Sequence, residues 1–143
     1  MPSITTLLCP VDFSKMSRAV LDYAVFMAQS HQARLTLIHV VDQLHGFDNY
    51  RILQMTAVEI AHEMEQHAKT ELDALIATLP IPATCAIRFG RAADEIVHQA
   101  KEDEASLIVM GSHGRSGLSH LLVGSVAEAV VRHAPCPVLV VRQ

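Results

Sequence analysis

Short apolar, often β-branched runs alternate along the chain with longer segments in which apolar residues recur every three or four positions. The short runs predict strands at 5–11, 34–41, 84–89, 106–110 and 137–141. The longer segments predict helices: one that begins after an N-cap at Ser14, one over about 51–79, one around 93–100 and one that ends near 133. Apolar runs this short and continuous are typical of strands buried on both faces.

Strands that alternate with helices of this length indicate a parallel sheet. We therefore expect an α/β fold, a doubly wound five-stranded parallel sheet with helices on both faces. The sequence shows neither an internal repeat nor a low-complexity segment, so residues 1–143 are expected to form a single domain.

Composition excludes several classes of protein. Of the 143 residues, 50% are hydrophobic and 18% are charged, which is too apolar for a disordered chain. The purely apolar runs are much shorter than the roughly 20 residues that a bilayer requires, so no membrane insertion is expected. The net charge is −4 and the eleven basic residues are scattered, which argues against a nucleic-acid partner.

Cysteine usage and the N-terminus favour the cytoplasm. The three cysteines form no CxxC pair, and residues 1–8 carry neither the basic nor the long apolar region of a secretory signal. Cys9 has no activating partner nearby in the sequence, so we expect it to be a small buried apolar residue.

A glycine-rich segment follows the predicted strand at 106–110. Gly111 and Gly114 allow positive φ and close backbone approach, so this loop can direct several N–H groups at one anion. Arg115 would add positive charge and His113 a hydrogen-bond donor. The alternative is that the glycines only shape a surface turn. The spacing fits neither a Walker A loop nor GxGxxG, but the loop lies at the carboxyl end of a strand, where doubly wound sheets bind ligands.

A second glycine, Gly124, stands just before the last predicted helix. Ser125 and Glu128 have the spacing of a capping box at the start of that helix. The N–H groups and the positive dipole end of the helix would favour a phosphate. Alternatively, Ser125 only caps the helix.

Polar and apolar residues also follow the first two strands. Asp12 leaves the first strand at its carboxyl end, where a carboxylate can accept hydrogen bonds from a ribose or an adenine amino group; capping of the next helix is the equal alternative. The apolar residues at 39–42 could floor a base pocket, although core packing is the simpler interpretation.

Together, Gly111 and Gly114, nine further residues and then Gly124-Ser125, with Asp12 at the end of strand one, resemble the ATP-binding branch of the universal stress protein family. The similarity extends over 8–12, 37–41, 107–115 and 135–141, and so covers essentially the whole chain. The glycine spacing does not depart from that of the family. The resemblance implies an adenine nucleotide alpha hydrolase-like, Rossmann-like form of the sheet.

The resemblance also implies which residues contact ATP. Asp12 and Val40 would face the adenosine. The pocket lining would be Pro10, Val11 and Met110, and the ribose and phosphate contacts would be Gly111, Gly114, Gly124, Ser125 and Val126. A divalent ion, Mg²⁺ or Mn²⁺, would accompany the triphosphate.

Family members also form homodimers through the last strand, which here contains Val138, Leu139, Val140 and Val141. Pairing of two copies would cover a sheet edge. Whether dimers pair further into tetramers is left open.

Other polar residues give no pattern for catalysis or metal binding. His62-Glu63 is followed by His67 five positions on, so the two imidazoles diverge on a helix, and no zinc site is expected. No nucleophile and base pair emerges, and Arg115 alone could neutralise a leaving phosphate. We therefore predict no catalytic residues.

The function expected from the sequence is a cytoplasmic, ATP-binding regulatory module of the stress response that acts through homo-oligomerisation. The alternatives are a slow ATPase or self-phosphorylating enzyme, a nucleotide-free dimeric scaffold, and a binder of flavin or cyclic nucleotide.

Overall fold

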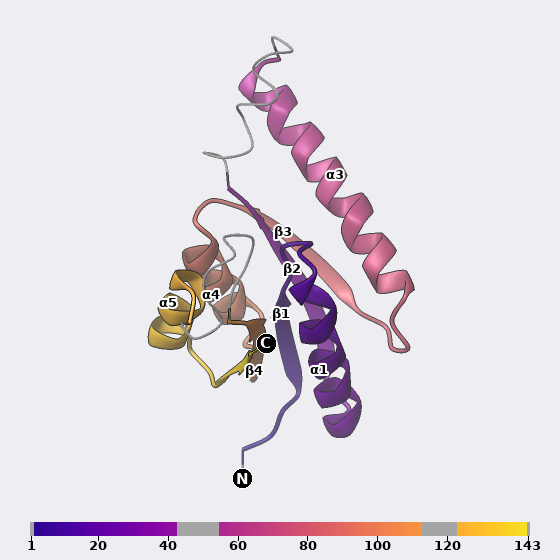
Figure 1. Ribbon diagram of the computed structural model, residues 1–143, viewed down its shortest axis with the longest axis vertical. Helices are drawn as coiled ribbons and strands as arrows, with labels where there is room; N and C mark the ends of the chain where they lie inside the picture. Colours follow the sequence, from indigo (N-terminus) through magenta and orange to yellow (C-terminus); the bar gives the residue numbers. More distant parts are fainter. Residues whose placement is uncertain (1, 43–54, 113–122, 143) are drawn as a thin grey trace.

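The computed structural model describes residues 2–42, 55–112 and 123–142. One parallel sheet contains β1 (Thr6–Pro10), β2 (Arg34–Val41), β3 (Thr84–Phe89), β4 (Leu107–Gly111) and β5 (Val138–Val141), in the order β3-β2-β1-β4-β5. The helices are α1 (Met16–His31), α3 (Ala57–Ala77), α4 (Ala92–Glu102) and α5 (Ser125–His133). α1 and α3 lie on one side of the sheet, and α4 and α5 on the other (Figure 1). The expected fold class is confirmed.

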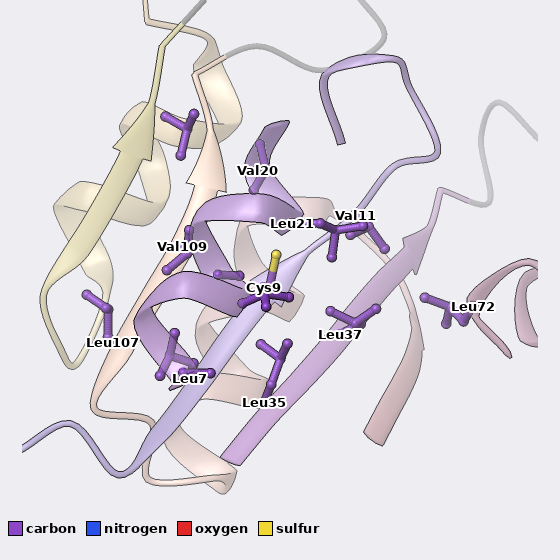
Figure 2. Packing of buried hydrophobic residues seen from close by; sticks show 14 residues of the cluster. Leu7, Cys9, Val11, Val20, Leu21, Leu35, Leu37, Leu72, Leu107 and Val109 are labelled. Carbon is purple, nitrogen blue, oxygen red and sulfur yellow. The ribbon is translucent and has the colours of Figure 1, made fainter. Parts of the chain in front are cut away.

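Alternate residues of the strands enter two separate cores. Leu7, Cys9 and Leu37 are fully buried in an α1-side core (Figure 2). Leu8 and Ile38, one position away in each strand, are fully buried in an α5-side core beneath α4 and α5. β4 is buried in the same way, with Leu107 and Val109 in the α1-side core and Ile108 and Met110 in the α5-side core, which explains its continuous apolar run. The complete burial of Cys9 confirms the expectation of a small buried apolar residue, and this burial raises the pKa of its thiol to about 12.

Element bounds agree with the sequence prediction except at some helix starts. β2 and β3 have the predicted bounds, and the ends of the other strands move by one residue. α3 begins at Ala57 because the Thr56 hydroxyl caps it, accepting from the Glu59 N–H at 3.2 Å. Residues 51–54 of the predicted helix lie outside the described residues. Within the described residues, no helix combines the length and apolar composition needed to cross a bilayer.

The predicted N-cap at Ser14 is wrong. α1 begins at Met16 after Lys15, which has a helical backbone conformation and, among the described residues, no side-chain cap. The Asp12 carboxylate instead orders this turn: its Oδ1 accepts from the Ser14 N–H at 3.0 Å and from the Ser17 hydroxyl at 3.2 Å. The Ser14 hydroxyl itself is buried without a hydrogen-bond partner in the described part of the chain.

A charged cluster joins α4 to the edge strand β3. Arg88 on β3 donates from Nε to Glu95 Oε1 at 2.9 Å and from Nη1 to Gln99 and Glu102 at 3.1 and 3.2 Å. The guanidinium lowers the pKa of Glu95, whose side chain is only 18% exposed. Because Glu95 lies in the first turn of α4, this bond fixes the start of that helix against the sheet.

Arg88→Met should lower the free energy of unfolding by about 1–3 kcal/mol near neutral pH, because it removes charge-assisted bonds and keeps most of the stem. The pKa of Glu95 is depressed in the folded protein, so its contribution is present above its ordinary pKa and is lost as pH falls through the folded value. In urea unfolding, the difference from the unmutated protein should therefore shrink between pH 6 and pH 3. Arg132→Met, which breaks the exposed pair with Glu128, is the control and should cost under about 0.5 kcal/mol; an equal loss for both variants would contradict this role.

Candidate functional site

The candidate site lies where the strand order reverses. The chain runs from β1 outward to β2 and β3, and α4 then carries it back across the sheet to β4, which pairs with the other side of β1. Loops that leave neighbouring strands in opposite directions open a crevice at their carboxyl ends. Here β1 leads to Asp12, and β4 ends at Gly111.

A short hydrogen-bonded junction connects the end of β4 to the start of α5. The Gly124 N–H donates to the Ser112 carbonyl at 2.6 Å, and the Ser112 N–H donates to the Val141 carbonyl of β5 at 3.0 Å. Ser112 and Gly124 are both buried. The junction therefore sets the start of α5 directly beside Gly111. His113, Gly114 and Arg115, which the sequence also assigned to the site, lie outside the described residues.

The capping box predicted at Ser125 is wrong. Gly124 is the N-cap of α5, with an extended backbone at φ −65° and ψ 159°, and no described side chain caps the helix. Ser125 is instead the first helical residue and is exposed, as is Val126. Glu128 pairs with Arg132 at 2.9 Å rather than returning to the N-cap. The Ser125 hydroxyl is therefore not engaged as a cap, and the first turn of α5 presents backbone N–H groups that can receive an anion.

Apolar residues from three strands lie on the α5-side face near this crevice. Val40 and Met110 both contact the α5-side core, together with Ala127 from the first turn of α5. Pro10 lies two positions beyond Leu8, so strand alternation places it on the same face. The structure thus gathers Pro10, Val40 and Met110 at one end of one face.

Val11 does not join them through its side chain. That side chain is 4% exposed and packs in the α1-side core (Figure 2). Any contact of Val11 with a ligand on the α5-side face would have to come from its backbone.

The sequence did not predict any role for Phe13, the residue after Asp12. Phe13 has a left-handed backbone, with φ at 63°, and its ring lies on the imidazole of His39 with centroids 4.5 Å apart. His39 Nδ1 lies 2.9 Å from the Val11 carbonyl oxygen. The Asp-x-Ser spacing of Asp12 and Ser14 signals the Asx turn, but no local signal reveals the contact of the Phe13 ring with His39 of β2.

Two further features lie away from this crevice. His62 and His67 are exposed on α3, and across the described ranges no three His, Cys, Asp or Glu residues come together as a metal site. A groove of about 760 Å³ lies at the opposite, amino end of the sheet, where Gln29, Gln32 and Arg34 contribute to its lining.

Comparisons with known proteins bear on this geometry. The sequence profile of the Universal stress protein family matches residues 3–142. Universal stress protein YxiE of Bacillus subtilis is 34% identical over 146 residues, covering 95% of this chain and 97% of that protein. The structure of universal stress protein UspA from Lactobacillus plantarum has a TM-score of 0.79 and 34% identity, covering 98% and 99% of the two chains. A universal stress protein solved in complex with cAMP has a TM-score of 0.64 and 26% identity, covering 98% of each chain.

Proposed function

Because this chain belongs to the universal stress protein family, we propose that it binds ATP at the carboxyl ends of β1 and β4. We further propose that it acts as a nucleotide-dependent regulatory module in the stress response. The observation that carries this proposal is the junction between Ser112 and Gly124, which sets the uncapped start of α5 beside the end of β4. The cAMP complex of a relative supports a nucleotide as the ligand class.

In this proposal the nucleotide spans the crevice from β2 to α5. The base and ribose lie near Pro10, Asp12 and Val40, on the apolar α5-side face. The phosphates lie at Gly111, at Gly114 and at the start of α5, where Gly124 is the N-cap and Ser125 and Val126 are the first helical residues. Backbone N–H groups and the positive end of the helix dipole stabilise the phosphate charge there.

A divalent ion is proposed to accompany the triphosphate. The described residues offer no cluster of carboxylates or imidazoles. The phosphate oxygens and water would therefore supply most of the ligands of the ion, as is common for Mg²⁺. When bound, the ion would neutralise phosphate charge. The chain's own part is to hold the phosphates at α5.

Calorimetric titration with ATP and Mg²⁺ tests the proposal. We expect Asp12→Asn to weaken ATP binding tenfold or more, about 1.4 kcal/mol. The reason is that the charged carboxylate, which would accept hydrogen bonds from the adenosine, is replaced by a neutral amide. Asn retains an Oδ1 that can accept from Ser14 and Ser17, so the start of α1 should survive. Asp12→Ala should lose the same affinity and also some stability.

The same titration, together with an assay of phosphate release, separates the alternatives. Absence of ATP binding by the unmutated protein would contradict the proposal and favour a nucleotide-free scaffold. Sustained phosphate release at about one per second would favour an enzyme, since that rate is within the range of ordinary turnover.

We also propose a homodimer formed through β5. This strand is at the edge of the sheet, next to β4 on one side only, and contains Val138, Leu139, Val140 and Val141. Three of the four are only half-buried in one copy. Pairing with a second copy would satisfy the edge and cover these side chains. Sedimentation of a monomer at micromolar concentration would contradict the dimer.

A further inference from the structure

The backbone that immediately precedes Asp12 is held by β2 in two ways. The Val11 N–H donates to the Ile38 carbonyl at 2.8 Å. The Val11 carbonyl lies 2.9 Å from Nδ1 of the His39 imidazole. A carbonyl oxygen only accepts, so Nδ1 carries the hydrogen in this bond. Both polar backbone groups of Val11 are therefore fixed, one by the main chain and one by the side chain of adjacent β2 residues.

The residue that follows Asp12 also contacts His39. Phe13 has a φ of 63°, a left-handed conformation that residues other than glycine rarely adopt. Its ring lies on the imidazole, with centroids 4.5 Å apart and planes inclined by 36°. This contact favours the unusual backbone conformation, because it packs the Phe13 ring against His39 at the edge of the α1-side core.

We propose that His39 is a positioning residue for the nucleotide site, which it serves by holding both neighbours of Asp12. The inference rests on the proposed function. His39 lies on the same face of β2 as Leu37 and Val41, which are buried in the α1-side core, whereas Val40 faces the α5 side. His39 therefore acts through Asp12 and does not contact the nucleotide from the Val40 face. A loop fixed before binding loses less conformational freedom on binding, so affinity depends on the His39 contacts.

Amide side chains can test the Nδ1 bond separately from the ring. Asn carries its N–H at the position of Nδ1, one atom beyond Cγ, whereas Gln carries it at the position of Nε2. We expect His39→Leu and His39→Gln to weaken ATP binding about tenfold in calorimetry. His39→Asn, which keeps the bond to Val11 but loses the ring contact with Phe13, should weaken it by no more than about threefold. Rescue by Asn but not Gln is not expected of a residue that only fills space.

His133→Leu is the matched control. His133 Nδ1 makes the same kind of bond, 2.9 Å to the Ala129 carbonyl, but in the last turn of α5 and away from Asp12. We expect its ATP affinity to be unchanged. Circular dichroism of each variant establishes that it is folded, and if His39→Leu does not fold, the Asn and Gln variants provide the comparison.

A double-mutant cycle tests whether His39 acts through Asp12. In an Asp12→Ala background, His39→Leu should weaken ATP binding by less than twofold, because the group that it positions is gone. An equal tenfold loss in both backgrounds would overturn the inference, as would unchanged affinity in the Leu and Gln variants or failure of Asn to rescue. No ATP binding by the unmutated protein overturns the proposed function as well, so the two failures are distinguishable.

Discussion

Replacing Ser125 by Asp should weaken ATP binding by at least about tenfold while leaving the protein as stable as before or more so. Ser125 is exposed in the first turn of α5, where a negative side chain interacts favourably with the helix dipole by about 0.3–1 kcal/mol. The same charge would oppose a phosphate at the same N–H groups. Like charges about 4 Å apart near a protein surface repel by about 4 kcal/mol before salt screening, well above the 1.4 kcal/mol of a tenfold loss.

Because Ser125→Asp should lower the ATP affinity without lowering the stability, a loss of binding cannot be attributed to a loss of folding. Calorimetry with ATP and Mg²⁺ measures the affinity, and urea unfolding measures the stability. Val131→Asp, an exposed position later in the same helix, adds the same charge away from its N-terminal end and should leave the affinity unchanged. Undiminished affinity in Ser125→Asp would show that the phosphates do not lie at α5.

Leu37→Ala should lower the free energy of unfolding by about 2–5 kcal/mol, because it leaves a cavity in a closely packed core. Leu37 is fully buried at the centre of β2, paired in register with Cys9 of β1 and Cys85 of β3. Domains of this size have total stabilities of about 5–15 kcal/mol, so this single change would remove a large fraction.

The matched control is Val58→Ala, since Val58 is an aliphatic side chain that is 80% exposed on α3. Its loss should be within about 0.5 kcal/mol. Similar midpoints of urea unfolding for the two variants would contradict the assignment of Leu37 to the core.

The fold could be predicted because burial on both faces leaves a simple pattern in the sequence. β2 and β3 have the expected bounds. Pro10 is the last residue of β1, a position where the absence of a backbone N–H disrupts the hydrogen bonds of the sheet least. The strand order was expected only in outline, from the alternation of strands and helices. The register that pairs Pro10 with Ile38 follows from three-dimensional packing and leaves no local signal.

Helix starts were predicted less well, because several residue types can cap a helix and the backbone decides which one does. Ser14 and Ser125 both look like N-caps in the sequence. In the structure the turn before α1 is ordered by the Asp12 carboxylate, and the extended backbone before α5 belongs to Gly124. The second correction matters for function, since it leaves the Ser125 hydroxyl outside the helix cap.

The residues of the candidate site were assigned through the family resemblance that the glycine spacing and Asp12 carry, but the contacts that support them were not predicted. Pro10, Val40 and Met110 share a face because each strand alternates, which a sequence does show. The bond from His39 to Val11 and the ring contact with Phe13 depend on the pairing of two strands and on a left-handed residue. Neither is encoded by a local spacing.

The most direct test of the central claim is a titration of the ¹⁵N-labelled, unmutated protein with ATP and Mg²⁺, followed by NMR of the assigned backbone amides. Binding at the carboxyl ends of β1 and β4 predicts the largest shifts at Ser112, Ser125 and Val126, and none at Gln32 and Arg34 beside the groove at the amino end of the sheet. Absence of shifts, or shifts confined to that groove, would contradict a nucleotide site at α5.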